Sequence, residues 1–322
     1  MRRTLAAHRP RRRSRRGPAA RRGALGAVSA GPAGRGRGAP GAPARRRLSL
    51  SRRAPGGSPV GDAGDAAAPA PKWIDTHCHL RLETCDAELA AARQAGVAAV
   101  IAIGIDVADS REAIAVASRH GDVRAAAGVH PHEAAGGIDG LAELLEREEV
   151  VAVGETGLDY HYNHSPHPEQ RRAFAQQIAL AHEAGLALVI HSRAAWDETF
   201  AVLAAEGVPE RTVFHCFTGG PREAERALQI GAYLSFSGIV TFPKAPEVRE
   251  AAVRCLPDRL LVETDAPLLA PVPLRGRPNS PANVAVVGAA VAQARRVAPA
   301  ELAATTTVNA CRAFGLEGLG VR

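Results

Sequence analysis

The chain has 322 residues, 46% of them hydrophobic and 23% charged, and this length suits one large domain or two ordinary ones. The hydrophobic content excludes disorder throughout the chain, and no uninterrupted apolar run approaches the ~18 residues of a membrane-spanning helix. The five cysteines are scattered and form no C-x-x-C pair, which argues against a disulfide scaffold or a thiolate zinc site and leads us to expect a cytoplasmic protein.

The formal net charge of +7 is divided unevenly along the chain. Residues 1–71 hold 17 arginines against Asp62 and Asp65, a net charge of +15, whereas the other 251 residues hold 23 basic and 31 acidic side chains, a net charge of −8. The first segment is built almost wholly from Arg, Ala, Gly, Pro and Ser, so we predict a disordered basic extension. It could contact nucleic acid non-specifically; the alternatives are a targeting leader or a stretch translated from a wrongly chosen start.

We predict that residues 72–322 form one domain, in which short apolar runs alternate with amphipathic helical stretches. The candidate strands are 73–77, 98–104, 123–128, 150–154, 186–191, 211–215, 232–236 and 260–264. The candidate helices are 86–95, 109–119, 139–148, 168–184, 195–206, 221–230, 246–255, 282–295 and 299–314. Eight such units in ~250 residues predict an α/β fold, a (β/α)8 TIM barrel. The alternative is an open doubly wound sheet, which the missing G-x-G-x-x-G after the first strand disfavours.

Potential metal ligands stand where five of the eight predicted strands end, which in a barrel is the end that carries the chemistry. They are His77 and His79 after the first strand, Glu155 after the fourth, His191 after the fifth, His215 after the sixth and Asp265 after the eighth. Each one alone is typical of an ordinary polar strand end. Together, in one register, they predict a metal site, and imidazoles mixed with carboxylates suit zinc, manganese or magnesium.

These motifs resemble the TatD family of metal-dependent deoxyribonucleases and hydrolases, within the wider amidohydrolase-like barrels. The resemblance covers 73–315 and is carried by the segments 74–79, 128–132, 154–159, 191–193, 215–219 and 263–267. It implies that His77, His79, Glu155 and Asp265 hold one divalent metal ion, and that Glu155, His191 and His215 hold a second. Wider relatives often use a carbamylated lysine as the bridge, whereas the fourth strand here offers Glu155 and no lysine.

Candidate substrate contacts come from three loops near the same strand ends. The loop 275–281 departs from the family, which often has a basic residue where Pro278 stands and an acidic one where Ser280 stands; Arg275, Arg277 and Asn279 remain as candidates. Arg193 is expected to pair with a phosphate oxygen, with a surface salt bridge as the alternative. His130 is expected to bind phosphate or carry a proton. The aromatic side chains of 160–164 could stack on bases, or form an ordinary polar loop.

The expected reaction is hydrolysis of DNA phosphodiester bonds by two divalent ions (Mg, Mn or Zn) about 3.5–4 Å apart. Glu155 bridges the ions, while Asp265 helps to deprotonate the attacking water and returns a proton to the leaving oxygen. Because an acidic body disfavours tight binding to long duplexes, we expect an exonuclease acting on single-stranded or frayed ends. We also expect a monomer with no membrane partner. Two alternatives stay open: a metal-dependent ester or amide hydrolase, such as a deacylase of misacylated tRNA, and a non-enzymatic nucleic-acid binder working through the arginine-rich extension.

Overall fold

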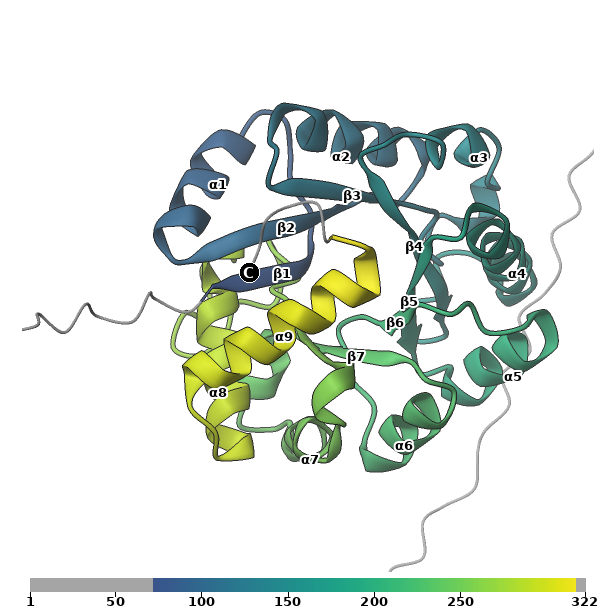
Figure 1. The fold of residues 1–322 in the computed structure, drawn as a ribbon. Helices are drawn as coiled ribbons and strands as arrows, with labels where there is room; N and C mark the ends of the chain where they lie inside the picture. The colour runs from purple at the N-terminus through teal and green to yellow at the C-terminus, as the bar shows by residue number, and fades with distance from the viewer. Residues whose placement is uncertain (1–71, 317–322) are drawn as a thin grey trace, which may run out of the picture. The chain divides into compact units, whose positions relative to one another are not determined.

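The computed structural model describes residues 72–316, where eight parallel strands pair in the order of the sequence (Figure 1). The strands are β1 (Trp73–Cys78), β2 (Val97–Ile103), β3 (Val123–Ala127), β4 (Val150–Asp159), β5 (Ala187–Arg193), β6 (Thr212–Phe214), β7 (Tyr233–Phe236) and β8 (Leu260–Val262). A parallel bridge between Cys78 and Ala266 joins the segment after β8 to β1. The sequential order and this closure confirm the predicted barrel and exclude the doubly wound sheet. The predicted basic extension, 1–71, lies outside the described residues.

Helices surround the strands, as Figure 1 shows. They are α1 (Cys85–Gln94), α2 (Val107–Arg119), α3 (Leu141–Leu144), α4 (His167–Ala184), α5 (Trp196–Glu206), α6 (Pro221–Gln229), α7 (Pro246–Arg254), α8 (Val284–Arg295) and α9 (Pro299–Phe314). Short 3-10 turns span Ala134–Gly136, Gly238–Thr241, Pro257–Arg259 and Pro281–Asn283. Helix ends follow local chemistry: the Asp106 side chain caps α2, and the left-handed Gly185 ends α4. Among the described residues, no helix is long and apolar enough to cross a membrane.

Two predicted elements differ from the observed ones by more than two residues at one end. The helix expected over 139–148 is only the four residues of α3, since Gly140 is left-handed and a run of charged residues follows the last leucines. The fourth strand continues past 154 to Asp159. A shift in register between Val153 and Thr156 lets β4 resume its pairing with β5, so that Asp159 pairs with Arg193. Glu155 therefore lies within this irregular strand rather than after it.

The barrel is closed by apolar side chains at one end only. Its interior contains Ile74, Ile101, Val189 and Leu261, and the residues Ala310, Ala313 and Phe314 of α9 pack against them. Helix α9 crosses this opening in Figure 1, and its Asn309 donates a hydrogen bond to the carbonyl of Leu260, where β8 begins. The starts of the strands thus face an apolar floor. The polar residues at the ends of the strands lie at the opposite opening.

Helix α8 approaches β1 closely at Gly288. A Cβ atom at this position would lie 2.2 Å from Cζ3 and 2.3 Å from Cη2 of Trp73, a residue that is 3% exposed. We expect Gly288→Ala to lower the free energy of unfolding by about 1–3 kcal/mol through overpacking, despite the better helix propensity of alanine. Urea unfolding followed by circular dichroism measures this. In a Trp73→Phe background, which removes the clashing atoms, the loss should largely vanish; an equal loss in both backgrounds would contradict this packing.

Candidate metal centre

The seam between β1 and the segment after β8 brings the first candidate ligands together. The buried carboxylate of Asp75 accepts hydrogen bonds from the backbone N–H and the hydroxyl of Thr264, at 2.8 and 2.5 Å. The backbone N–H of Asp265 donates to the carbonyl of His77 at 2.9 Å. These contacts, formed across almost the whole barrel sequence, set Asp265 beside His77 and His79.

His77, His79 and Asp265 form a compact group of donors. Oδ1 of Asp265 lies 3.5 Å from Nε2 of His79 and 3.8 Å from Nε2 of His77. Nδ1 of His79 faces the carbonyl of Ile103 at 3.3 Å, so this nitrogen carries the proton and Nε2 presents its lone pair to the group. Both ring nitrogens of His77 are buried without a hydrogen-bond partner. A cation held by these atoms would satisfy groups that are costly to bury unpaired.

Two glycines determine where Glu155 lies. Gly154 has a φ of 146° and Gly157 has a φ of 130°, values that residues other than glycine rarely adopt. A Cβ atom on Gly154 would lie 2.7 Å from the carbonyl oxygen of Val189, and one on Gly157 would lie 2.1 Å from that of His191. The Gly-Glu-Thr-Gly segment therefore packs its backbone directly onto β5. This close approach turns the carboxylate of Glu155 into the barrel mouth.

Glu155 lies among four imidazoles. Its Oε1 atom is 2.7 Å from Nε2 of His215, 3.0 Å from Nδ1 of His191 and 3.4 Å from Nε2 of His130. Its other oxygen, Oε2, is 3.4 Å from Nε2 of His77. The two oxygens thus face different histidines. A carboxylate in this position can bridge two cations.

Two further carboxylates lie beside the imidazole nitrogens of His215 and His191 that point away from Glu155. Oε1 of Glu263 lies 3.4 Å from Nδ1 of His215, and Oδ2 of Asp159 lies 3.4 Å from Nε2 of His191. Neither outer nitrogen makes a hydrogen bond of good geometry, although a carboxylate lies beside each one. With the ring proton on that side, each inner nitrogen would present a lone pair toward Glu155. Those two inner nitrogens are only 3.3 Å apart. Three acceptor atoms therefore converge on one place, which is favourable only when a proton or a metal cation lies between them.

His130 has the opposite tautomer. Its Nδ1 accepts a hydrogen bond from the backbone N–H of His132 at 3.0 Å, so in the neutral ring Nε2 carries the proton. That Nε2–H points at Glu155 and has no lone pair for a metal. Burial lowers the pKa of His130 to about 4, which keeps the ring neutral. His130 is therefore suited to donate a hydrogen bond to Glu155 or to a phosphate oxygen, rather than to bind a cation.

The electrostatics of the site favour charged carboxylates. Burial by itself raises the pKa of Glu155, but His215, His130 and His191 hold it well below its usual range. Burial opposes protonation of His215 too, yet Glu155 and Glu263 raise its pKa well above the ordinary value. The pKa of His77 is lowered, first by burial and then by His215, whose ring stacks on it at 3.8 Å. Without metal, the carboxylate charge is balanced by protons that metal binding would release.

The predicted substrate contacts occupy different settings. Arg193 is exposed, and its guanidinium carbon lies 4.6 Å from the ring centre of Tyr162; within residues 72–316 it has no acidic partner, so the salt-bridge alternative is not seen. Arg275 and Arg277 are exposed, and Arg275 lies over the ring of Phe242. Asn279 is 4% exposed. Its amide donates to the carbonyls of Thr264 and Leu268, so the contacts that it makes are structural.

Sequence reasoning assigned no role to Asp159 and Glu263. Both belong to motifs quoted for the family resemblance, and both are fully buried carboxylates at strand ends. Their roles depend on which imidazole nitrogen each one faces, a contact that links positions 32 and 48 residues apart in the chain. The sequence feature that could have identified both residues is an acidic residue beside an apolar strand, because burying an unpaired carboxylate is costly.

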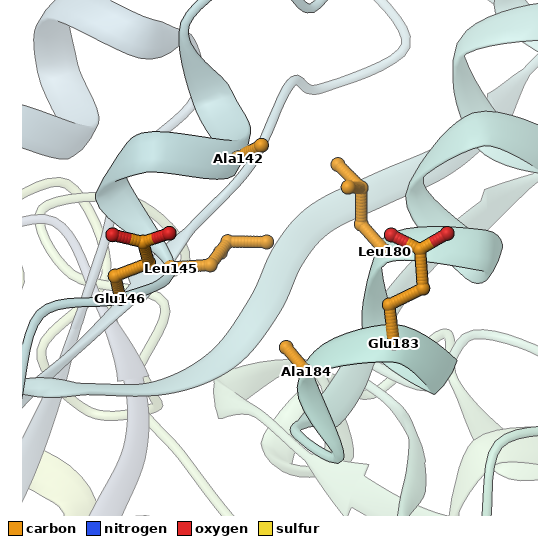
Figure 2. A pocket seen from close by; sticks show the side chains of 6 residues that line it. All are labelled: Ala142, Leu145, Glu146, Leu180, Glu183 and Ala184. Carbon is orange, nitrogen blue, oxygen red and sulfur yellow. The ribbon is translucent and has the colours of Figure 1, made fainter.

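A pocket on the outer layer is a poor alternative site. Figure 2 shows it between α3 and α4, lined by Ala142, Leu145, Glu146, Leu180, Glu183 and Ala184. Because α4 ends at Ala184, just before β5 begins, this pocket lies toward the starts of the strands, away from the imidazoles. The carboxylates of Glu146 and Glu183 would repel an anionic ligand. The barrel mouth remains the candidate centre.

Comparison with known proteins places most of the chain in one family. The family described as TatD related DNase matches residues 74–315. The uncharacterized metal-dependent hydrolase YabD of Bacillus subtilis is 37% identical over 250 residues, covering 75% of this chain and 98% of YabD. The 3'-5' ssDNA/RNA exonuclease TatD of Klebsiella pneumoniae is 36% identical, covering 73% of this chain and 94% of that protein. The crystal structure of YjjV, a TatD homologue from Escherichia coli K12, aligns with a TM-score of 0.71 at 31% identity, over 76% and 98% of the two chains.

Glu263 offers a test of the outer carboxylates. We expect Glu263→Gln, which keeps the shape but removes the charge facing His215, to weaken divalent-metal binding by about 10- to 100-fold. Competition with a chromogenic chelator, after the purified protein has been stripped of metal, measures this affinity. Glu301→Gln, an exposed position on α9, is the matched control and should bind metal as the parent does. An unchanged metal affinity in Glu263→Gln would show that this carboxylate does not orient His215 for metal binding.

Proposed function

Since the chain belongs to the TatD family of metal-dependent hydrolases, we propose that it hydrolyses DNA phosphodiester bonds with two divalent metal ions, as an exonuclease on single-stranded ends. The observation that carries this proposal is the position of Glu155, whose two oxygens face separate imidazole groups. The name of the Klebsiella relative, an exonuclease of single-stranded DNA and RNA, supports the choice of substrate.

The proposed ligand sets are those implied by the sequence. His77, His79 and Asp265 would hold one ion together with Glu155, and His191 and His215 would hold the other with the same glutamate. The lone pairs that converge on Glu155 support this division, as do the buried unpartnered nitrogens of His77. Mixed imidazole and carboxylate donors suit zinc, manganese or magnesium. His130 is left outside the set, because its inward nitrogen is a donor.

In the proposed reaction the bound ions supply Lewis acidity toward water and phosphate. The residues of the chain then position the substrate and move protons. Asp265, with 10% of its side chain exposed, accepts a proton from the attacking water and returns one to the leaving oxygen. His130 donates its Nε2–H toward a phosphate oxygen. Arg193, on the strand that carries His191, neutralises phosphate charge at the rim.

Other features of the chain support the proposal that it acts on free ends of nucleic acid in the cytoplasm. The proposed ligand sets need no residue from a second copy, and we propose that the protein acts as a monomer. The scattered cysteines, which form no C-x-x-C pair, remain the basis for proposing a reducing compartment. A net charge of −8 outside residues 1–71 disfavours a long duplex lying across the body, whereas a single-stranded end needs only the local basic rim. The arginine-rich extension could add non-specific contacts to nucleic acid.

Asp265→Asn tests the reaction. We expect this variant to lower kcat on end-labelled single-stranded DNA by about 10²- to 10⁴-fold, the usual contribution of a positioned acid or base. Products are resolved on a sequencing gel in magnesium, manganese or zinc. Asp258→Asn is the control, because Asp258 is exposed on the turn before β8 at the other end of the barrel.

The products distinguish the alternatives. Shortening from one end that is lost in Asp265→Asn supports an exonuclease. Internal cuts would replace it with an endonuclease. If wild-type protein binds metal but leaves DNA intact, hydrolysis of ester or amide bonds in the same centre becomes the better proposal. Nucleic-acid binding that is unaffected by His77→Ala and accompanied by no turnover would point to the arginine-rich extension.

Metal removal provides a second test. Dialysis against a chelator is expected to abolish cleavage, and re-addition of one divalent ion at a time is expected to restore it. Restoration should saturate at two ions per chain, counted by mass spectrometry of the native protein. A single ion at full activity would contradict the bridging role of Glu155.

A further inference from the structure

One cluster at the mouth of the barrel contains three side chains that have no role in the proposed chemistry, beside Arg193, which does. It consists of Tyr162 and His164 from the loop after β4, His132 from the loop after β3, and Arg193 from the end of β5; we call it the rim platform. The ring of Tyr162 makes an edge contact with His132 at 5.6 Å and with His164 at 5.8 Å. The guanidinium of Arg193 lies over the Tyr162 ring.

Tyr162 is unusual in its exposure. It is 53% exposed, whereas Tyr233 is buried and Tyr160 is half-buried. The exposed part of this ring gains nothing from the hydrophobic effect in the free protein. Arg193, whose guanidinium lies over the ring, has no carboxylate partner among residues 72–316. An aromatic face combined with an unpaired cation is the chemistry that recognises a base and its adjoining phosphate.

The loop that presents Tyr162 is firmly held. Oδ1 of Asp159 accepts hydrogen bonds from the backbone N–H groups of His161 and Tyr162, at 2.8 and 2.9 Å. The fully buried side chain of Gln170 donates to the carbonyls of Asp159 and Ser165, at 3.1 and 2.8 Å. Buried polar groups thus fix the backbone of an exposed loop. A surface prepared in this way loses little conformational entropy when a ligand binds.

The same aspartate connects the rim platform to the metal centre. Oδ2 of Asp159 lies 3.0 Å from Nε2 of His132 and 3.4 Å from Nε2 of His191. The backbone N–H of Tyr160 donates to the carbonyl of Arg193 at 2.9 Å, which ties the two strand ends together. A nucleotide on the rim platform would therefore lie next to a phosphate at His191.

Resting on the proposed function, we propose that the rim platform is a base-stacking subsite, in which Tyr162 stacks on an unpaired base adjoining the scissile phosphate and Arg193 pairs with a phosphate. Arg193 covers one face of the ring, and the base takes the other. The face of a paired base inside a duplex is covered by its neighbours, so this subsite accepts only an unstacked base. It thereby selects single-stranded ends.

The test separates base contact from phosphate contact. Fluorescence anisotropy measures binding of a labelled single-stranded oligonucleotide to the full chain carrying Asp265→Asn, in which turnover is blocked. Adding Tyr162→Ala is expected to raise Kd by roughly 5- to 150-fold. Adding Tyr162→Phe keeps the ring and should preserve the affinity. For an oligonucleotide with abasic sites at its end, Tyr162→Ala should leave Kd unchanged.

Arg193→Gln provides the complementary reading. If Arg193 contacts a phosphate, this variant should reduce the steepness of log K against log salt concentration by about 0.7, equally for normal and abasic oligonucleotides. Arg193→Lys, which keeps the charge, should retain the slope. An unchanged slope in Arg193→Gln would overturn the phosphate contact.

The outcomes also separate this proposal from the proposed function. Equal loss of affinity for normal and abasic DNA in Tyr162→Ala, or no loss at all, overturns the stacking subsite even if wild-type protein cleaves DNA. A loss confined to DNA that carries bases, with no cleavage by the wild-type protein, preserves the subsite and overturns the nuclease proposal. Circular dichroism of each variant excludes misfolding as the cause.

Discussion

The site depends on the closure of the barrel between its first strand and the segment after its last. Asp75 binds the backbone and hydroxyl of Thr264, and this contact holds Asp265 against His77. Burial raises the pKa of Asp75 to about 8, an effect that the hydrogen bonds from Thr264 oppose. At neutral pH this side chain is therefore largely protonated, which reduces the cost of burying it. Its hydrogen bonds with Thr264 are directional, and they fix the distance between candidate metal ligands that lie far apart in the sequence.

Around Glu155, several hydrogen-bond acceptors lie close together. Asp159 and Glu263 lie beside the outer nitrogens of His191 and His215, and protons on that side of each ring would leave lone pairs facing Glu155. Such an arrangement is unfavourable in isolation and becomes favourable with a cation. The preorganised centre therefore lowers the free energy of unfolding when no cation is bound. Its apolar floor, closed by α9, and the glycine contacts at 154 and 157 keep that centre rigid.

Asp159 contacts both the candidate metal centre and the loop that carries Tyr162. One of its oxygens faces His191 in the metal centre, and the other holds the backbone that presents Tyr162. A displacement of the rim loop would thus reach a proposed metal ligand through a single side chain. In the proposed function, the acidic body would repel nucleic acid except near Arg193 and Tyr162, where a cation and an aromatic ring lie together.

The sequence by itself determined the barrel and the identity of the candidate ligands, because strand and helix periods are local and parallel strands all end at one opening. His77, His79, Glu155, His191, His215 and Asp265 could be found in this way. Tertiary structure decided the extension of β4 to Asp159 and the structural contacts of Asn279, because each depends on contacts between separate segments, which no local pattern encodes. The short α3 and the donor tautomer of His130 depend instead on the backbone geometry of neighbouring residues, which the residue pattern alone does not fix.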